Sequence, residues 1–513
     1  LENSGNDIVD MHITCSNPTD VVFNNIIISS TNSVPNSNIF ASTTSVLIDG
    51  CNLYVSDWTF SECFSREESY GRLLAIQSTS SKNTIINFNR LEASHSGWGS
   101  SSEESLVYIN AQNNMNVTIL DSYFSHCSVN DIHNTVEVHV TDTSAISIHS
   151  TTFLNVTNGL YLSGPSYVKN CTFIGSEDTQ SAISVIGEQQ TIIDCTFTNF
   201  INVAMILTEV NGTISGCAFT NNTGDFNGGG LSISNSYIEI SNCNWINNRA
   251  VTEGGGLYIF NSDVFIDNSE FIENSVPFHN GGAISLASES SVTINNSLFL
   301  NNNAAYGGAI YLGGGSSLTI QSSEISYNTA IQAGGGLFFQ NHGFTNVINC
   351  TISSNHCAHG NGGGLSTHFL ASPIIDNCYI FNNSATSGGG ISITDGTAPT
   401  ISNCTILNNS ASSSGGGIVI QGLSVPIVKD CTINNNFANS TGGGVIVRDI
   451  ATPEFKNCYI ENNESPNEGG AVVFTDKSFS SFQKCTIRNN ESGGSGGGFA
   501  FGITAAGEFF DLS

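Results

Sequence analysis

Short apolar runs alternate with polar residues along the second half of the chain. Residues 417–420, 426–428 and 431–433 are runs of this kind, and each is too short for a helix. Apolar residues do not recur there at the helical spacing of 3.6, whereas a period of two fits strands. The pattern therefore predicts an all-β chain of very short strands.

A glycine cluster followed by an apolar residue returns every 26 to 28 residues. Self-similarity at a fixed period of this length is typical of a solenoid, in which each repeat stacks on its neighbours. The clusters begin at residues 228, 254, 281, 307, 334, 362, 388, 415, 442, 469 and 496.

A second motif, N/D-C-x-I/F-x-N-N, has the same period and is clearest at residues 403–409. Its cysteine becomes serine at Ser269, Ser297 and Ser323. The apolar position lies two residues after the cysteine and can be followed towards the N-terminus with wider spacing. We place the earliest members at Phe153, Phe124, Leu91, Phe60 and Ile27.

These repeats predict a single-stranded right-handed parallel β-helix (solenoid) of about 18 coils, each rising about 4.8 Å. The Ile/Phe column and the cysteines should point inward, the second Asn should form an amide ladder, and glycine should supply positive φ. Cysteines outside the ladder (Cys15, Cys51, Cys63, Cys127 and Cys357) are the better disulfide candidates. We expect irregular coils with long corner loops over 1–165, continuous with regular repeats over 166–513.

The paired glycine and aromatic motifs resemble the repeats of polymorphic outer-membrane proteins. They stand here as Gly281-Gly282-Ala283-Ile284 with Phe299-Leu300-Asn301-Asn302, and the resemblance covers residues from about 170 to 500. It implies a secreted or surface-fibre role, often in adhesion.

The composition favours an extracellular protein and disfavours nucleic-acid binding. The 513 residues include 42 acidic and 12 basic ones, a net charge of −30 that repels phosphates and anionic lipids. No apolar stretch is long enough for a membrane span. Sequons for N-glycosylation favour a secreted, extracellular or cell-surface glycoprotein. Sugar is expected on Asn116, Asn155, Asn170, Asn211, Asn221, Asn295, Asn349, Asn382, Asn403, Asn408 and Asn439, whereas Asn463 and Asn490 should be partly buried.

Insertions at one corner of the N-terminal coils form a candidate binding surface. Segments 61–72, 92–105 and 125–135 occupy that corner, so their acidic and aromatic residues should gather on one side. A carbohydrate or protein contact is one interpretation, and an irregular end that protects an open strand edge is the other. The residues are Glu67, Glu68, Tyr70, His95, Trp98, Glu103, Glu104 and His133.

The sequence offers no catalytic residues. Glycoside hydrolysis needs converging carboxylates, and Asp194, Asp376 and Asp430 should instead be solvated. The cluster His356-Cys357-Ala358-His359 matches no zinc spacing. We expect no metal and no cofactor; Ca²⁺ would suit the negative charge, but no calcium motif supports it.

The leading hypothesis is a non-enzymatic, structural or adhesive β-helical rod. Self-association into a filament, another surface protein and a glycan are the partners we consider. A polysaccharide lyase or hydrolase of the pectate-lyase type is one alternative. A carbohydrate- or host-binding adhesin acting through the N-terminal loops is another.

Overall fold

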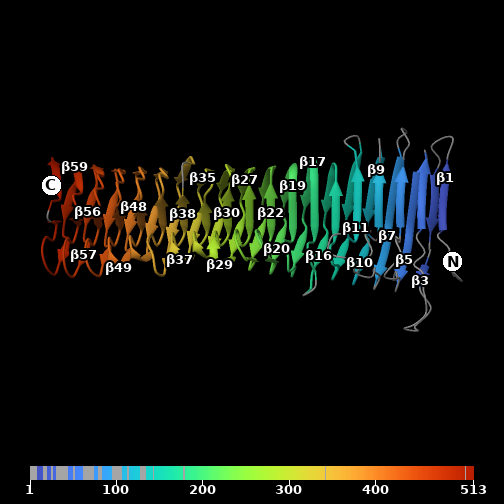
Figure 1. The fold of residues 1–513 in the computed structure, drawn as a ribbon, viewed down its shortest axis with the longest axis horizontal. Coiled ribbons are helices and arrows are strands. Elements are labelled where there is room, and N and C mark those ends of the chain that lie inside the picture. Colours follow the sequence, from blue (N-terminus) through green and yellow to red (C-terminus); the bar gives the residue numbers. More distant parts are fainter. Residues whose placement is uncertain are drawn as a thin grey trace. The chain divides into compact units, whose positions relative to one another are not determined.

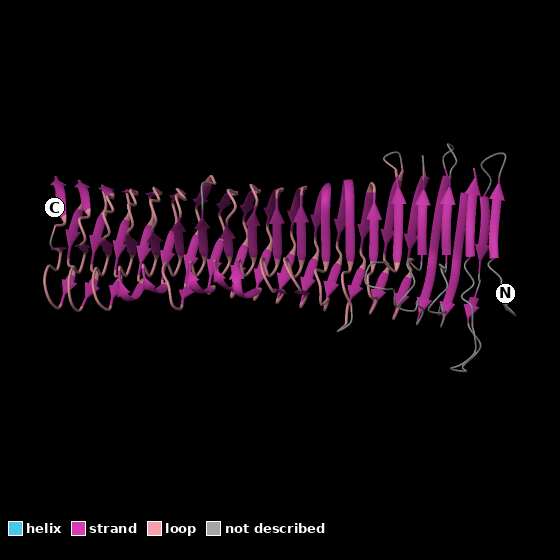
Figure 2. Cartoon of the chain, viewed as in Figure 1, coloured by secondary structure: helices cyan, strands magenta, loops and turns pink. Residues whose placement is uncertain are grey.

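The computed structural model describes residues 9–14, 20–24, 27–29, 44–49, 52–61, 74–78, 84–94, 105, 107–111, 115–127, 134–141, 144–176, 179–340, 343–502 and 504–512. Within these ranges the chain forms strands and turns and contains no helix (Figure 2). The chain divides into two compact units. One comprises residues 1–225 and 229–239, and the other comprises 226–228 and 240–513.

Each turn of the second unit contributes one strand to each of four parallel ladders (Figure 1). The first ladder follows the glycine clusters and contains β26 (Leu257–Phe260), β30 (Ile284–Ala287), β34 (Ile310–Leu312), β38 (Leu337–Gln340), β42 (Leu365–His368), β46 (Ile391–Ile393), β50 (Ile418–Ile420), β54 (Val445–Val447), β58 (Val472–Phe474) and β62 (Phe499–Phe501). The second contains β27 (Asp263–Asp267), β31 (Ser291–Asn295), β35 (Ser317–Gln321), β39 (Thr345–Ile348), β43 (Ile374–Asp376), β47 (Thr400–Ser402), β51 (Ile427–Lys429), β55 (Glu454–Lys456), β59 (Phe479–Gln483) and β63 (Ala506–Phe510).

The third ladder carries the Ile/Phe motif, and the fourth follows the paired asparagines. The third contains β24 (Asn244–Ile246), β28 (Glu270–Ile272), β32 (Leu298–Leu300), β36 (Glu324–Ser326), β40 (Thr351–Ser353), β44 (Tyr379–Phe381), β48 (Thr405–Leu407), β52 (Thr432–Asn434), β56 (Tyr459–Glu461) and β60 (Thr486–Arg488). The fourth contains β25 (Arg249–Ala250), β29 (Ser275–Asn280), β33 (Asn303–Tyr306), β37 (Thr329–Ala333), β41 (His356–Cys357), β45 (Ser384–Ser387), β49 (Ser410–Ser414), β53 (Phe437–Ala438), β57 (Glu464–Ser465) and β61 (Glu491–Ser492).

Two left-handed residues bend the chain on either side of each third-ladder strand. Asn403 and Asn408 flank β48, and both have a φ of 53°. Asparagine tolerates this conformation better than most residues that carry a Cβ. The recurrence of asparagine at these two places is therefore explained by the corner geometry.

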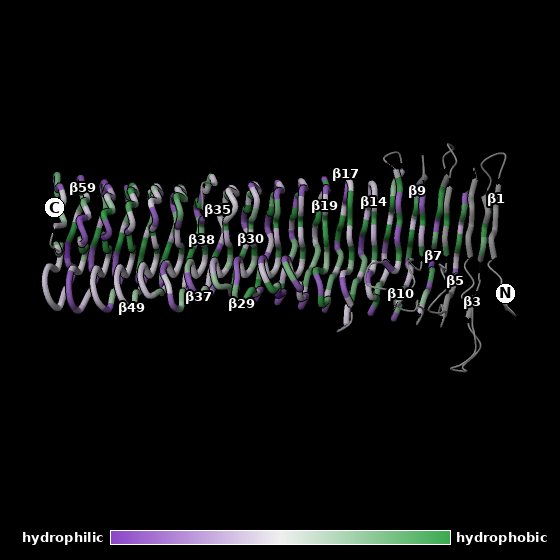
Figure 3. The backbone as a smooth tube through the Cα atoms, in the orientation of Figure 1, coloured by the Kyte–Doolittle hydropathy of each residue, from purple (hydrophilic) through white to green (hydrophobic). Residues whose placement is uncertain are grey.

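The inward column of the third ladder forms the core, as the sequence predicts. Trp245, Phe271 and Phe299 stack with ring centroids 4.6 and 4.9 Å apart and rings nearly parallel. Isoleucines continue the column from Ile325 to Ile460, all fully buried. Hydrophobic and hydrophilic stretches alternate around each turn, consistent with this inward column (Figure 3).

The second asparagine of each pair forms the predicted amide ladder. The backbone N–H and Nδ2 of Asn409 both donate to Oδ1 of Asn436, at 2.9 and 3.0 Å. Its Nδ2 also donates to the carbonyl of Ile380, and its Oδ1 accepts two bonds from Asn383. Every polar atom of this buried side chain is therefore satisfied, which a buried amide requires.

The ladder cysteines point inward, as expected. Cys404 is buried and unpaired, and its Sγ donates to carbonyls of Ser402 and Ile375. Cys127 and Cys357 are buried thiols, so the prediction of disulfides at these two positions is wrong. The other candidates, Cys15, Cys51 and Cys63, lie outside the described residues.

The glycine clusters serve two geometric needs. The first glycine of each cluster is left-handed, with φ between 60° and 75°. The second lies against the next turn, because a Cβ added at Gly416 would stand 2.4 Å from the carbonyl oxygen of Gly443. The third position is less crowded and is alanine at Ala283, Ala309 and Ala471.

From β38 to β58 the first ladder is buried on both faces, which strict alternation does not predict. Val419, Ile446 and Val473 occupy one outward column and are at most 4% exposed. A Cβ added at Gly388 would stand 2.6 Å from a methyl group of Val419, so glycine backbones cover this column. Because the glycines of the clusters carry no side chains, their backbones can pack directly on this outward column. The column therefore forms a second buried apolar layer.

The first unit contains three parallel ladders among its described residues. One comprises β1 (Val9–Thr14), β4 (Thr44–Asp49), β6 (Leu74–Ser78), β8 (Val107–Ala111), β11 (Val136–Val140), β14 (Leu160–Ser163), the N-terminal parts of β17 (Ile183–Ile193) and β19 (Met205–Ser215), and β22 (Leu231–Ser234). The second ladder contains β2 (Asp20–Asn24), β9 (Met115–Leu120), β12 (Ala145–His149) and β15 (Ser166–Lys169). The third contains β3 (Ile27–Ser29), β10 (Tyr123–Ser125), β13 (Thr152–Leu154), β16 (Thr172–Ile174), β18 (Thr196–Thr198) and β20 (Ala218–Thr220). The long strands β5 (Asn52–Ser61) and β7 (Thr84–Ser94) belong to both of these ladders.

The sequence alignment was wrong at two positions of this unit. Phe60 pairs with Ile28 and Ala93, not with Ile27 and Leu91. Leu91 instead pairs with Trp58, which lies two residues before Phe60. Later turns carry cysteine at that position. Both Leu91 and Ala93 are buried, so hydrophobicity alone could not distinguish the two columns.

Candidate functional site

The N-terminal surface predicted from the sequence lies outside the described residues. This applies to Glu67, Glu68, Tyr70, His95, Trp98, Glu103, Glu104 and His133. A binding role for them stays a prediction.

The sequon asparagines are placed on the outside of the turns. Asn155 and Asn295 are half-buried, and the other nine expected sites are exposed. By contrast, Asn463 belongs to the amide ladder and is 0% exposed, and Asn490 is half-buried at the next turn. Nine of the expected sites are therefore accessible and Asn463 is not, whereas Asn490 is half-buried like Asn155 and Asn295.

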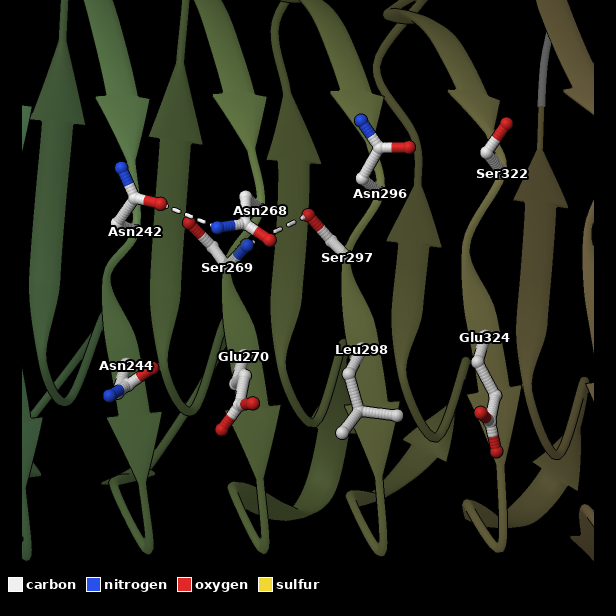
Figure 4. Close-up of a pocket in the computed structure, with 10 residues that line it drawn as sticks. All are labelled: Asn242, Asn244, Asn268, Ser269, Glu270, Asn296, Ser297, Leu298, Ser322 and Glu324. Atoms are coloured by element: carbon white, nitrogen blue, oxygen red, sulfur yellow. Dashed lines mark hydrogen bonds between the residues drawn. The ribbon is translucent and has the colours of Figure 1, made fainter.

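An open groove of about 470 Å³ crosses the third ladder over four consecutive turns (Figure 4). It runs along the outer face of β24, β28, β32 and β36 and the corners that precede them. Its lining is almost entirely polar: Asn242, Asn244, Asn268, Ser269, Glu270, Asn296, Ser297, Leu298, Ser322 and Glu324.

The groove coincides with turns in which serine replaces the ladder cysteine. The Ser269 hydroxyl donates to the Asp267 carbonyl and accepts the Cys243 backbone N–H, and Ser297 continues the chain. At the corner, Nδ2 of Asn268 donates to Oδ1 of Asn242 (Figure 4). These bonds fix the floor and one edge of the groove.

Two carboxylates face outward from the same column of the groove. Glu270 pairs with Leu298, which pairs with Glu324, so the carboxylates lie two turns apart. Two turns correspond to about 10 Å between backbones. Both side chains are exposed to solvent.

A second polar cluster joins three side chains of the second unit. His368 Nδ1 lies 3.1 Å from Asp395 Oδ2, and its Nε2 lies 3.1 Å from Ser366 Oγ. Burial lowers the pKa of His368, although Asp395 opposes the shift. The connectivity is that of a serine nucleophile and its base, but Ser366 is fully buried between Phe338 and Ser392, so its hydroxyl is closed to substrate.

The histidine and cysteine cluster does not converge. His356 and Cys357 are consecutive on β41, so His356 is exposed while Cys357 is buried. Burial raises the pKa of the Cys357 thiol to about 11. Among the described residues, no three His, Cys, Asp or Glu side chains gather as metal ligands. The same residues include no helix able to cross a membrane.

Comparison with known proteins identifies the family. The sequence matches the family described as right handed beta helix region over residues 181–352 and 282–447, which together cover more than half of the chain. The chain belongs to this family, and the solenoid is right-handed accordingly. No curated protein matches the sequence.

One similar solved structure is "The cryo-EM structure of the Vag8-C1 inhibitor complex". A chain of that complex shares 7% identity, and the alignment covers 97% of this chain and 100% of that one, with a TM-score of 0.28. A likeness this distant carries no functional argument.

Sequence reasoning missed both the groove and the histidine cluster. Glu270 and Glu324 are separated by two whole repeats, so their proximity emerges only when the columns are aligned turn by turn. The signal for the second cluster was the alternation of Ser366 and His368 on one strand face. Its third member, Asp395, comes from the following turn.

Proposed function

We propose that this chain is an extracellular, N-glycosylated β-helix with a structural or adhesive role. The observation that carries the proposal is the separation of sequons by face, because nine of the eleven expected asparagines are exposed at corners and outer strand positions. Attachment of sugar requires an accessible asparagine, and these positions provide it.

The internal ladders support a load-bearing role. In the described residues of the second unit, the amide ladder continues from Asn248 to Asn490, with each rung bonded to the next. Such a stack resists local opening, because breaking one rung leaves buried polar groups unpaired. The repeat motifs resembling those of polymorphic outer-membrane proteins favour the same role at a cell surface.

Glycopeptide mass spectrometry of the protein isolated from its native source tests the proposal. We expect sugar on several outward asparagines, including Asn349 and Asn403, and none on Asn463. A protein without sugar at any outward sequon would contradict an extracellular location. Negative-stain microscopy of the same material would then show whether it forms filaments.

A further inference from the structure

We infer that the groove across β24, β28, β32 and β36 binds a neutral oligosaccharide, and that this face is kept free of attached sugar. Only the claim that this face carries no attached sugar rests on the proposed glycosylation. The groove itself and its polar lining are features of the fold.

Sequons are missing from the corners around this groove. Of the eight left-handed residues that flank the four strands, none begins an N-x-S/T tripeptide, although five are asparagine. On the next three turns the same corners carry sequons at Asn349, Asn382, Asn403 and Asn408. The eight residues are Asn242, Asn247, Asn268, Glu273, Asn296, Asn301, Ser322 and Tyr327.

The nearest sequon outside these corners starts at Asn295. It ends the second-ladder strand β31 and is half-buried, and its Oδ1 is enclosed by protein. Asn295 is not among the groove-lining residues. A sugar there would stand beside the groove rather than on its floor.

The lining suits hydroxyl groups. Asparagine amides both donate and accept, and the carboxylates of Glu270 and Glu324 accept from hydroxyl donors. Leu298 lies between the two carboxylates and offers an apolar contact to the C–H face of a sugar ring. The two carboxylates and the chain's net charge of −30 disfavour acidic sugars such as uronides.

The groove extends over four turns along the stack. Equivalent backbone positions recur at about 4.8 Å, so four turns present a row of about 14 Å. A ligand made of several units along the same axis can contact one turn after another. This favours a short chain of sugars over a single small molecule.

New sequons placed inside and outside the groove test the inference. Asn244→Thr creates a sequon at Asn242, a groove residue, and leaves both carboxylates in place. Tyr379→Thr creates one at Asn377, at the matching position two turns beyond the last groove strand. Threonine already occupies this strand position at Thr351 and Thr405, so both variants should fold.

Binding is measured by calorimetry on the full chain from a glycosylating host, with glucan, mannan and chitin hexasaccharides and an oligogalacturonate. We expect at least one neutral hexasaccharide to bind. Sugar at Asn242 should weaken that binding about tenfold or more, and sugar at Asn377 should leave it within about twofold. Asn244→Thr made without N-glycans measures the loss of the Asn244 amide alone, and the tenfold weakening by sugar is expected relative to that preparation.

The double substitution Glu270→Gln with Glu324→Gln should weaken binding about tenfold, because it removes charge-assisted bonds. Glu464→Gln is the matched control, since Glu464 is exposed on the fourth ladder, away from the groove. Binding of the oligogalacturonate alone, binding of none of the probes, or equal affinity in the groove and control variants would overturn the inference. Glycosylation mapping is a separate readout, so failure of binding leaves the proposed function standing.

Discussion

Nδ2 of Asn409 lies 3.0 Å from Oδ1 of Asn436, one turn further along the chain. The same contact recurs between Asn383 and Asn409. A side chain that serves two neighbouring turns at once couples their stability.

Replacing Asn409 with alanine should therefore destabilise the protein strongly. Asn409→Ala leaves donors of Asn383 and the carbonyl of Ile380 buried without partners. We expect a loss of about 3 kcal/mol or more in the free energy of unfolding, measured by chemical denaturation. Ser412→Ala, at an exposed position, should change it by less than about 0.5 kcal/mol.

The second and third glycines of a cluster should differ in tolerance. Gly416→Ala drives a Cβ to within 2.4 Å of the Gly443 carbonyl, whereas Gly417→Ala reproduces the alanine seen at Ala283 and Ala309. We expect a loss of about 3 kcal/mol for the former and less than about 1 kcal/mol for the latter, by the same denaturation assay. Equal effects would mean that this close approach between turns is absent.

Serine should replace a ladder cysteine with little cost. Ser269 Oγ donates to the carbonyl two residues earlier at 2.9 Å, and Cys404 Sγ makes the same contact at 3.0 Å. Cys404→Ser should therefore cost less than about 1.5 kcal/mol, and Cys404→Asp, which buries a charge, several kcal/mol. Thermal unfolding of the two variants checks this, and a cost for serine as large as that for aspartate would contradict the ladder.

His368 should make stability depend on pH. Its folded-state pKa is lowered by burial, so the unfolded chain takes up the proton first as the pH falls. This contribution is fully present above about pH 6.5 and is lost as the pH falls from there towards the lower folded-state pKa. His368→Gln should reduce the fall in melting temperature below pH 6.5. An unchanged pH profile in that variant would contradict the buried position of the imidazole.

Much of the fold could be predicted from the sequence, because each ladder residue has a repeated and specific role. Asn409 predicts the corner and Cys404 predicts the inward column, and neither prediction depends on the residues beside them. The outward column of Val419 and Ile446 was not predictable in this way, since its burial depends on glycine backbones from other turns. At Leu91 and Ala93 two apolar residues compete for one column, and only pairing distinguishes them.

The candidate site was less predictable than the fold. Glu270 and Glu324 carry no local motif and become neighbours only through the stacking of turns. The Asp395 partner of His368 likewise comes from another turn. The surface that the sequence did suggest, at Trp98 and its neighbours, lies outside the described residues.

An experimental structure of the protein secreted from a glycosylating host tests the central claim most directly. We predict parallel turns of 26 to 28 residues over 228–500, with sugar at outward asparagines such as Asn349 and Asn403. The corners from Asn242 to Tyr327 should be bare, and Asn463 should lie unmodified in the amide ladder. Antiparallel sheets or helices in this region, or sugar attached to Asn463, would contradict the account.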